Sequence, residues 1–112
     1  MTSAVVMRTS AGLVQRDPTE NRIRALLGAL SRDEYVILER FGSSNSHYIQ
    51  VWRRLGGVFQ LEYRAGGPSE HYQTRADSRD KVVSALTGWS KGESAWRDDF
   101  EWLSIGDWFN RQ

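Results

Sequence analysis

The stretch that decides the fold is HYIQVWRRLGGVFQLEYR, residues 47–64. In its second half, Phe59, Leu61 and Tyr63 share one face of an extended chain, and the polar residues between them share the other. Such alternation is typical of a strand with one face in a hydrophobic core. Because the glycine-containing loop at 55–57 is too short for a parallel crossover, we expect an antiparallel hairpin.

Two further runs with strand character flank this hairpin. The run EYVILERF contains four adjacent large apolar residues, a pattern typical of a central strand or of one buried on both faces. The second run is shorter and follows a Gly-Gly-Pro turn. Since the loops are short, consecutive strands should be neighbours in one sheet. The predicted sheet is a four-stranded antiparallel meander of residues 34–41, 47–54, 58–64 and 70–75.

A helix is predicted on each side of these strands. Asp17 is the expected N-cap of the first helix, with Pro18 at its first position and a stripe of Ile and Leu side chains along one face. Asp77 is the expected cap of the second helix, which Gly92 ends. The expected helices cover residues 18–31 and 78–90.

The predicted fold class is α+β, with residues 1–112 in a single domain and both helices, one N-terminal and one C-terminal, on one face of the sheet. Two alternatives stay open for residues 1–16. They add an edge strand through Ala4–Met7, or they form a flexible arm.

The composition excludes several classes of protein. The chain has 112 residues, no cysteine and a net charge of +1. Without cysteine there are no disulfides, no thiolate-bound metals and no thiol nucleophile. No apolar run approaches the ~20 residues that cross a bilayer, and the first residues lack the apolar core of a secretion signal. We therefore expect a cytoplasmic protein that does not contact a membrane.

No group of residues has the spacing of a catalytic or cofactor site. His47 and His71 each lack a second histidine at ligand spacing, and no serine lies in a G-x-S-x-G motif. The carboxylates of Asp98, Asp99 and Glu101 are a possible acid–base or Mg²⁺ set, but neighbouring carboxylates rarely converge on one point. The sequence predicts a non-enzymatic protein with no metal or cofactor, and leaves a role for either histidine open.

Two stretches are candidates for binding a partner. The closing segment interleaves acidic and aromatic residues, which would combine electrostatic steering with buried anchors. The first hairpin strand interleaves aromatic and basic residues, a pattern that also occurs in single-stranded nucleic-acid binding, although the charge of +1 disfavours that reading. The core is the alternative place for each tryptophan. The candidate partner-binding residues are Glu93, Trp96, Asp98, Asp99, Glu101 and Trp108 in the closing segment, and Tyr48, Trp52 and Arg54 in the hairpin.

A longer pattern extends from the hairpin to the closing segment. A strand LEYR is followed by the turn Gly66–Gly67, a second strand, a helix closed by Trp89 and Gly92, and then Trp102. Over residues 57–105 this order resembles the first immunity-protein family of bacterial polymorphic toxin systems. The resemblance implies a small cytoplasmic α+β protein without catalytic residues, which blocks a cognate toxin domain by binding it.

An immunity protein is therefore the expected function. Inhibition by binding needs a rigid scaffold and a few aromatic or arginine anchors, and no reaction centre. The alternatives are a small enzyme or ligand-binding accessory protein with a pocket between sheet and helices, and a structural subunit of a larger assembly. The sequence leaves the toxin, the binding surface and the oligomeric state open.

Overall fold

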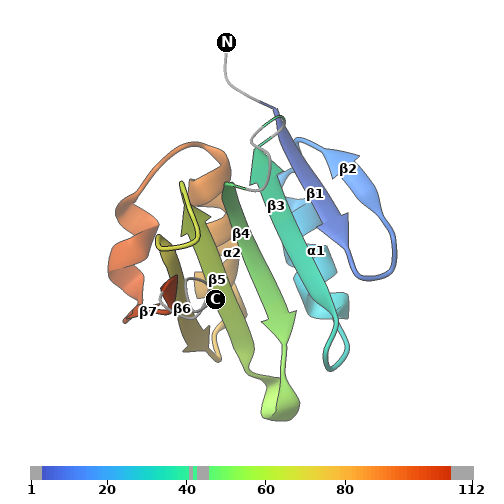
Figure 1. Ribbon diagram of the computed structural model, residues 1–112. Helices are drawn as coiled ribbons and strands as arrows, with labels where there is room; N and C mark the ends of the chain where they lie inside the picture. Colours follow the sequence, from blue (N-terminus) through green and yellow to red (C-terminus); the bar gives the residue numbers. More distant parts are fainter. Residues whose placement is uncertain (1–3, 41, 43–45, 107–112) are drawn as a thin grey trace.

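Seven strands form one antiparallel sheet in the part of the chain that the structure describes, a computed structural model covering residues 4–40, 42 and 46–106. Two helices pack on the same face of this sheet (Figure 1). The spatial order of the strands is β2-β1-β3-β4-β5-β6-β7. The elements are β1 (Val5–Thr9), β2 (Val14–Arg16), α1 (Glu20–Ala29), β3 (Tyr35–Arg40), β4 (His47–Arg53), η1 (Leu55–Gly57), β5 (Phe59–Ala65), β6 (His71–Ala76), α2 (Arg79–Ser90), η2 (Ala95–Asp99) and β7 (Leu103–Ser104).

The prediction of a four-stranded meander between terminal helices was wrong. The chain before α1 forms two strands, and the chain after α2 adds a short seventh strand to β6. Neither helix is therefore terminal. Of the two alternatives for residues 1–16, the strand is present, but β1 is an interior strand because it pairs with both β2 and β3. The pairing of β1 with β3 spans the whole of α1, and local sequence patterns carry no information about such a contact.

The predicted hairpin is confirmed, with β4 and β5 antiparallel and Val51 opposite Leu61. The face that holds Ile49, Val51 and Leu61 is fully buried. Gly56 and Gly57 both have positive φ in the connecting turn, a conformation that glycine adopts without strain. The alternation in the sequence therefore predicted both the pairing and the core face of the central strands.

The core fills the space between this face and the two helices. Because strand side chains alternate, every second residue of β1, β3, β4 and β5 enters it. Arg40 joins sheet and helix: its guanidinium donates to the carbonyl oxygens of Trp89 at 2.6 Å and Ser90 at 3.1 Å, and stacks on the Trp89 ring. A cation is favoured at this end of α2 by the exposed carbonyls and the helix dipole. The large buried side chains include Met7, Ile23, Leu27, Leu38, Ile49, Phe59, Leu61 and Leu86.

Both helix caps differ from the prediction. Thr19 caps α1 by accepting a hydrogen bond from the backbone N–H of Arg22, whereas Asp17 has a φ of +47° and accepts from the N–H of Val5 at 2.9 Å. Ser78, not Asp77, caps α2. In each case two capping residues stand close together in sequence, and the direction of the incoming strand decides between them. Within the described residues, neither helix is long and apolar enough to cross a bilayer.

The closing segment is anchored by two tryptophans. Trp96 is 5% exposed and packs edge-on against Tyr63 and Trp102, with ring centroids 5.1 Å and 5.8 Å away. Its indole N–H donates to the carbonyl of Glu93 at 2.7 Å. Gly88 in α2 makes room for the ring, since a Cβ there would lie 2.9 Å from Trp96 Cδ1. Trp96 is therefore a core residue in this structure.

Replacing Trp96 with Ala should destabilise the fold. Loss of a buried indole ring leaves a cavity, and we expect the free energy of unfolding to fall by about 3–5 kcal/mol. Denaturant unfolding followed by circular dichroism would measure this. Leu103→Ala is the matched control, because Leu103 is 58% exposed and its truncation should change stability by less than about 0.5 kcal/mol. A similar loss in both variants would contradict the placement of Trp96.

Candidate functional site

The second face of the sheet carries the candidate site. Both helices lie on the opposite face, so the described helices leave this one uncovered (Figure 1). The strand register brings aromatic, amide and arginine side chains together on it. We refer to it as the outer face. Across its central strands it consists of Tyr35, Ile37, Glu39, Tyr48, Gln50, Trp52, Gln60, Glu62, Arg64, His71, Gln73 and Arg75.

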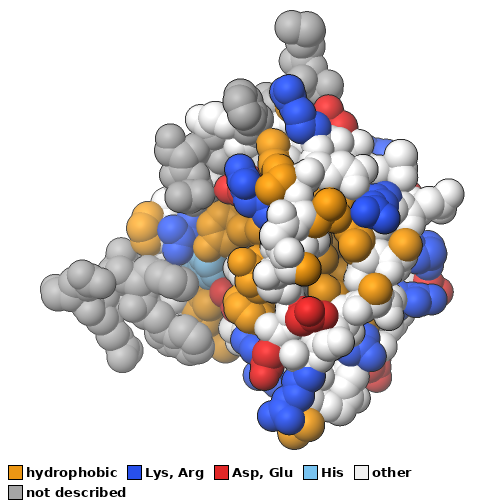
Figure 2. Space-filling model, turned by 90° about the vertical axis from the view of Figure 1, so that its right-hand side faces the viewer, with side chains coloured by type: hydrophobic (Ala, Val, Ile, Leu, Met, Phe, Trp, Pro, Cys, Tyr) orange, Lys and Arg blue, Asp and Glu red, His pale blue; other side chains and the backbone are white. Residues whose placement is uncertain are grey.

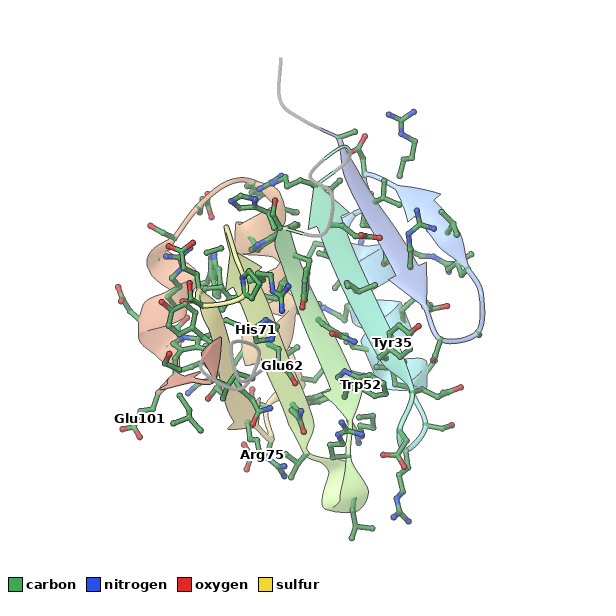
Figure 3. All side chains as sticks on the ribbon, in the orientation of Figure 1. Tyr35, Trp52, Glu62, His71, Arg75 and Glu101 are labelled. Carbon is green, nitrogen blue, oxygen red and sulfur yellow. The ribbon has the colours of Figure 1, made fainter. Side chains whose placement is uncertain are left out.

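An aromatic pair lies at one end of the outer face. Tyr35 on β3 is directly opposite Trp52 on β4, and their ring centroids are 4.7 Å apart (Figure 3). The guanidinium of Arg54 lies over the Trp52 ring at 4.6 Å. Within the described residues, the Trp52 indole N–H and the Tyr35 hydroxyl form no hydrogen bond, and both atoms remain open to solvent. These partly buried rings can pack against an apolar group and still donate hydrogen bonds to polar acceptors beside that group.

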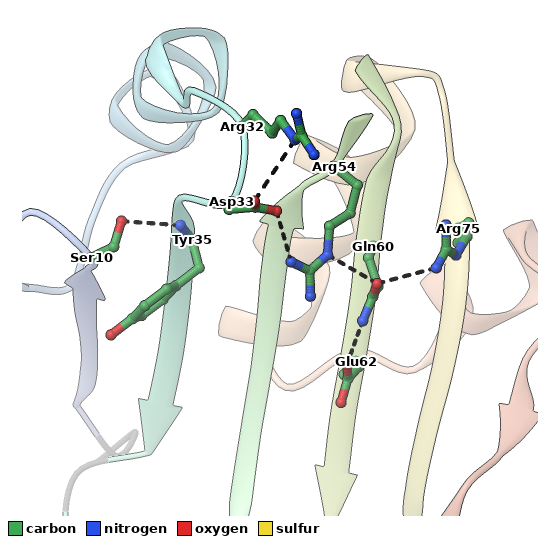
Figure 4. A network of polar contacts seen from close by, with 8 residues as sticks. All are labelled: Ser10, Arg32, Asp33, Tyr35, Arg54, Gln60, Glu62 and Arg75. Atoms are coloured by element: carbon green, nitrogen blue, oxygen red, sulfur yellow. Dashed lines mark hydrogen bonds and ion pairs between the residues drawn. The ribbon is translucent and has the colours of Figure 1, made fainter. Parts of the chain in front are cut away.

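Two arginines meet beside this pair at the side-chain amide of Gln60. Arg54 Nε donates to Gln60 Oε1 at 3.1 Å, and Arg75 Nη2 approaches the same oxygen at 3.5 Å (Figure 4). On its other side, Arg54 Nη1 pairs with Asp33 at 3.0 Å. The amide nitrogen of Gln60 donates to Glu62 Oε2 at 2.8 Å. The amide is thus held with its oxygen toward the arginines and its nitrogen toward the carboxylate.

A buried pair, His71 and Glu62, holds this network in place. His71 is 1% exposed, and its Nε2 lies 2.8 Å from Glu62 Oε1. Arg64 Nε donates to His71 Nδ1 at 3.1 Å, so the proton of the neutral ring is on Nε2 and points at the carboxylate. Burial alone would raise the pKa of Glu62, but hydrogen bonds from His71, Gln60 and Gln73 outweigh burial and lower the pKa below 4.5. The pair acts as a fixed end of the polar network.

The arrangement around His71 does not resemble a reaction centre. Both ring nitrogens are engaged, and the ring is inaccessible to a substrate. Within the described residues, no three His, Cys, Asp or Glu side chains are grouped so that they could hold a metal ion. His47, the other histidine for which the sequence left a functional role open, is exposed and contacts Ser46.

A cavity lies elsewhere, between the start of α1 and the end of α2. It has a volume of about 720 Å³ and is lined by Thr19, Arg40 and Thr87 among others. Arg40 is already bonded to the carbonyls of α2, and Thr87 Oγ1 is buried without a hydrogen bond among the described residues. The positive end of α1 and the negative end of α2 both face this space, so it offers no net field for a charged ligand.

The structure separates the two predicted groups of partner-binding residues. Trp52 and Arg54 are in contact, and Tyr48 lies on the same face next to His71. The closing segment lies at the β7 edge, where Figure 3 shows Glu101 far across the sheet from Tyr35 and Trp52. Its acidic side chains are exposed, Trp96 is buried, and Trp108 lies outside the described residues. The exposed acidic residues are Glu93, Asp98, Asp99 and Glu101.

Sequence reasoning did not single out Tyr35, Gln60 or Arg75 as site residues. The alternation in residues 58–64 did place Gln60 on the polar face of its strand. Tyr35 was part of an apolar run that predicted burial, and only the register shows it opposite Trp52. Arg75 comes from a strand that is not a chain neighbour of β4, so only the assembled sheet brings it near Arg54.

The side of the molecule beyond β2 is less distinctive. Seen from there, hydrophobic side chains gather in the middle and charged side chains surround them (Figure 2). Val14 on β2 is 55% exposed, whereas Leu13, Leu26 and Leu30 are partly buried and packed against the core. Single exposed apolar residues such as Val14 are common on protein surfaces.

Comparison with family models, with curated proteins and with solved structures finds no match for this chain. The argument for function therefore comes from its own residues.

Replacing Glu62 with Gln should change how stability depends on pH. A carboxyl whose pKa is lower in the folded state stabilises the fold above its unfolded-state pKa, and this contribution is lost as the pH falls through the folded-state value. We expect wild-type unfolding free energy to decrease between about pH 6 and about pH 3, and the E62Q variant to show a smaller decrease. Urea unfolding across this range measures both.

Glu93→Gln provides the matched control, since that carboxylate is exposed. The E93Q variant should lose as much unfolding free energy as the wild type when the pH is lowered over the same range. An E62Q protein that loses as much stability as the wild type would show that Glu62 does not couple folding to pH.

Proposed function

We propose that this protein is a non-enzymatic protein-binding module that contacts its partner through Tyr35, Trp52 and Arg54. The observation that carries the proposal is the aromatic pair with an arginine stacked on it, on a sheet face that the described helices leave uncovered. Trp, Tyr and Arg are the residues most enriched at the energetic centres of protein interfaces. Tyr35 and Trp52 are held by strands β3 and β4, and Arg54, which directly follows β4, is held by Gln60 and Asp33. Little conformational entropy is therefore lost on binding.

A protein partner suits this site better than a nucleic acid. Sequence-tolerant binding of single strands requires aromatic rings whose π faces are free to stack on bases. The Trp52 ring is already stacked upon by Arg54 and contacted by the Tyr35 ring. Its indole N–H has no hydrogen-bond partner among the described residues and can donate to a partner. That donor fits a pocket or turn of a protein surface.

We further propose that the partner is a cognate bacterial toxin domain, which this protein neutralises by direct binding. The resemblance of residues 57–105 to an immunity-protein family supports this assignment. So does the location of His71, which is too buried and too fully bonded to serve the alternative of a small enzyme. Blocking by occupancy requires only a rigid complementary surface.

The proposal predicts that truncation of Trp52 shortens the lifetime of the complex. In a complex with the cognate toxin domain, Trp52→Ala should raise the dissociation rate at least about thirtyfold, equivalent to about 2 kcal/mol for an interface anchor. Surface plasmon resonance measures this, with thermal unfolding to confirm that the variant folds. Val14→Ala is the control, because Val14 is an exposed apolar residue at the β2 edge. Equal rates for the two variants, or no binding of the toxin by the wild type, would contradict the proposal.

The exposed acidic residues of the closing segment have a separate proposed role. Peripheral charges act mainly on the rate of encounter. Changing Asp98, Asp99 and Glu101 to Asn, Asn and Gln should slow association with a basic toxin and weaken its salt dependence, with little change in dissociation. Association rates measured between about 50 and 300 mM NaCl test this. Association that is unchanged at low salt would exclude these residues from steering.

A further inference from the structure

Arg75 is an exposed guanidinium held near a second one without a carboxylate between them. Its interaction within the described residues is the 3.5 Å approach to Gln60 Oε1, the same oxygen that accepts from Arg54 at 3.1 Å. Asp33 pairs with Arg54 on the other side and lies 3.8 Å from Arg32. A neutral amide oxygen thus positions two cations that repel each other.

The amide is fixed by the groups behind it. Gln60 is 7% exposed, and its nitrogen is bonded to Glu62 Oε2, which also accepts from Gln73 at 3.1 Å. The other oxygen of Glu62 accepts from His71. Glu62 is bonded to His71, Gln60 and Gln73, and among the described residues it forms no ion pair with Arg54 or Arg75. The network therefore orients the two arginines, of which Arg54 is ion-paired with Asp33 and Arg75 has no ion pair among the described residues.

We propose that Arg54 and Arg75 together bind a carboxylate of the partner protein, an Asp or Glu side chain that lies beside an apolar group packed on Tyr35 and Trp52. Guanidinium groups bind carboxylates through paired N–H donors, and a second guanidinium adds donors from another direction. The free indole N–H of Trp52 adds a donor next to this position. The inference rests on the proposed function, since it describes the chemistry of the partner at the same face.

The charges beside Gln60 favour an anionic group. Among the residues drawn in Figure 4, Arg32, Arg54 and Arg75 are positive, and Arg75 also lines a separate pocket that contains Asp77, Asp99 and Glu101. Asp33 and Glu62 carry two negative charges, of which Glu62 is bonded within the sheet. A carboxylate placed at Arg54 and Arg75 would offset the repulsion between them. A phosphate of a nucleic acid would meet the same cations, but its bases would find the Trp52 ring already covered.

The test uses sodium acetate as the carboxylate probe and needs no partner. In the labelled full-length protein, the Nε–H signals of Arg54 and Arg75 should shift along a saturating curve with acetate and not with equal concentrations of sodium chloride. The Arg75→Gln variant should weaken the response of Arg54 at least about fivefold, since one set of donors is lost. Arg54→Gln should do the same to the response of Arg75.

Arg8→Gln is the matched control, because Arg8 is an exposed arginine whose Nε is bonded to Glu39 at 2.6 Å. It should leave the Arg54 response within about twofold of wild type. Three results would each overturn the inference: equal shifts with chloride, an unchanged Arg54 response in R75Q, or tighter binding of a uridine oligonucleotide than of acetate at these arginines. Unchanged backbone amide signals away from β6 verify that R75Q folds.

The outcome is separable from that of the proposed function. If the toxin domain binds through Trp52 while acetate does not shift the arginines, the carboxylate site is wrong and the binding face stands. If acetate binds at Arg54 and Arg75 but the toxin domain does not bind, the site stands and the choice of partner is wrong.

Discussion

The packing of α1 and α2 on a single face of the sheet is the constraint on which the rest depends. Strand side chains alternate, so burying Val36, Val51 and Leu61 beneath the helices turns their neighbours to the other side. Tyr35, Trp52 and Gln60 are those neighbours, and the register places them in adjacent strands. If the register of one strand shifted by one residue, its apolar side chains would move to the outer face and its polar side chains into the core. The resulting loss of buried apolar surface disfavours that shift. The composition of the outer face is thus a consequence of the core.

A hydrogen-bonded network of polar side chains lies on the outer face, which the described helices do not cover. His71 and Gln60 are both buried there, and a chain of hydrogen bonds connects them through Glu62. Buried polar groups are costly unless their bonds are satisfied, and these are satisfied by one another. The result is a surface whose exposed groups are positioned by bonds beneath them. Such preorganisation favours binding, because few side chains have to be immobilised.

The closing segment shows how one pattern can serve two purposes. Its aromatic and acidic residues alternate closely enough in sequence to suggest a single interface. In the fold Trp96 turns inward against Tyr63, and Asp98 and Glu101 turn to solvent. The cost of exposing large rings to water, and of burying unpaired charges, separates the two kinds of side chain. The anchors of the segment therefore hold the fold, and its charges remain on the surface.

The sequence by itself determined the β4–β5 hairpin, its core face and the positions of both helices, because these follow from alternation, turn residues and apolar stripes within a few residues of chain. It also indicated Trp52 and Arg54 as candidates. Only the tertiary structure decided that β1 is an interior strand, that Tyr35 lies opposite Trp52 and that Arg75 lies near Arg54. These are contacts between strands that do not follow each other or whose register the sequence leaves open. They depend on which strand order and register bury the most apolar surface over the whole sheet. A pattern within a few residues of chain carries no information about that total.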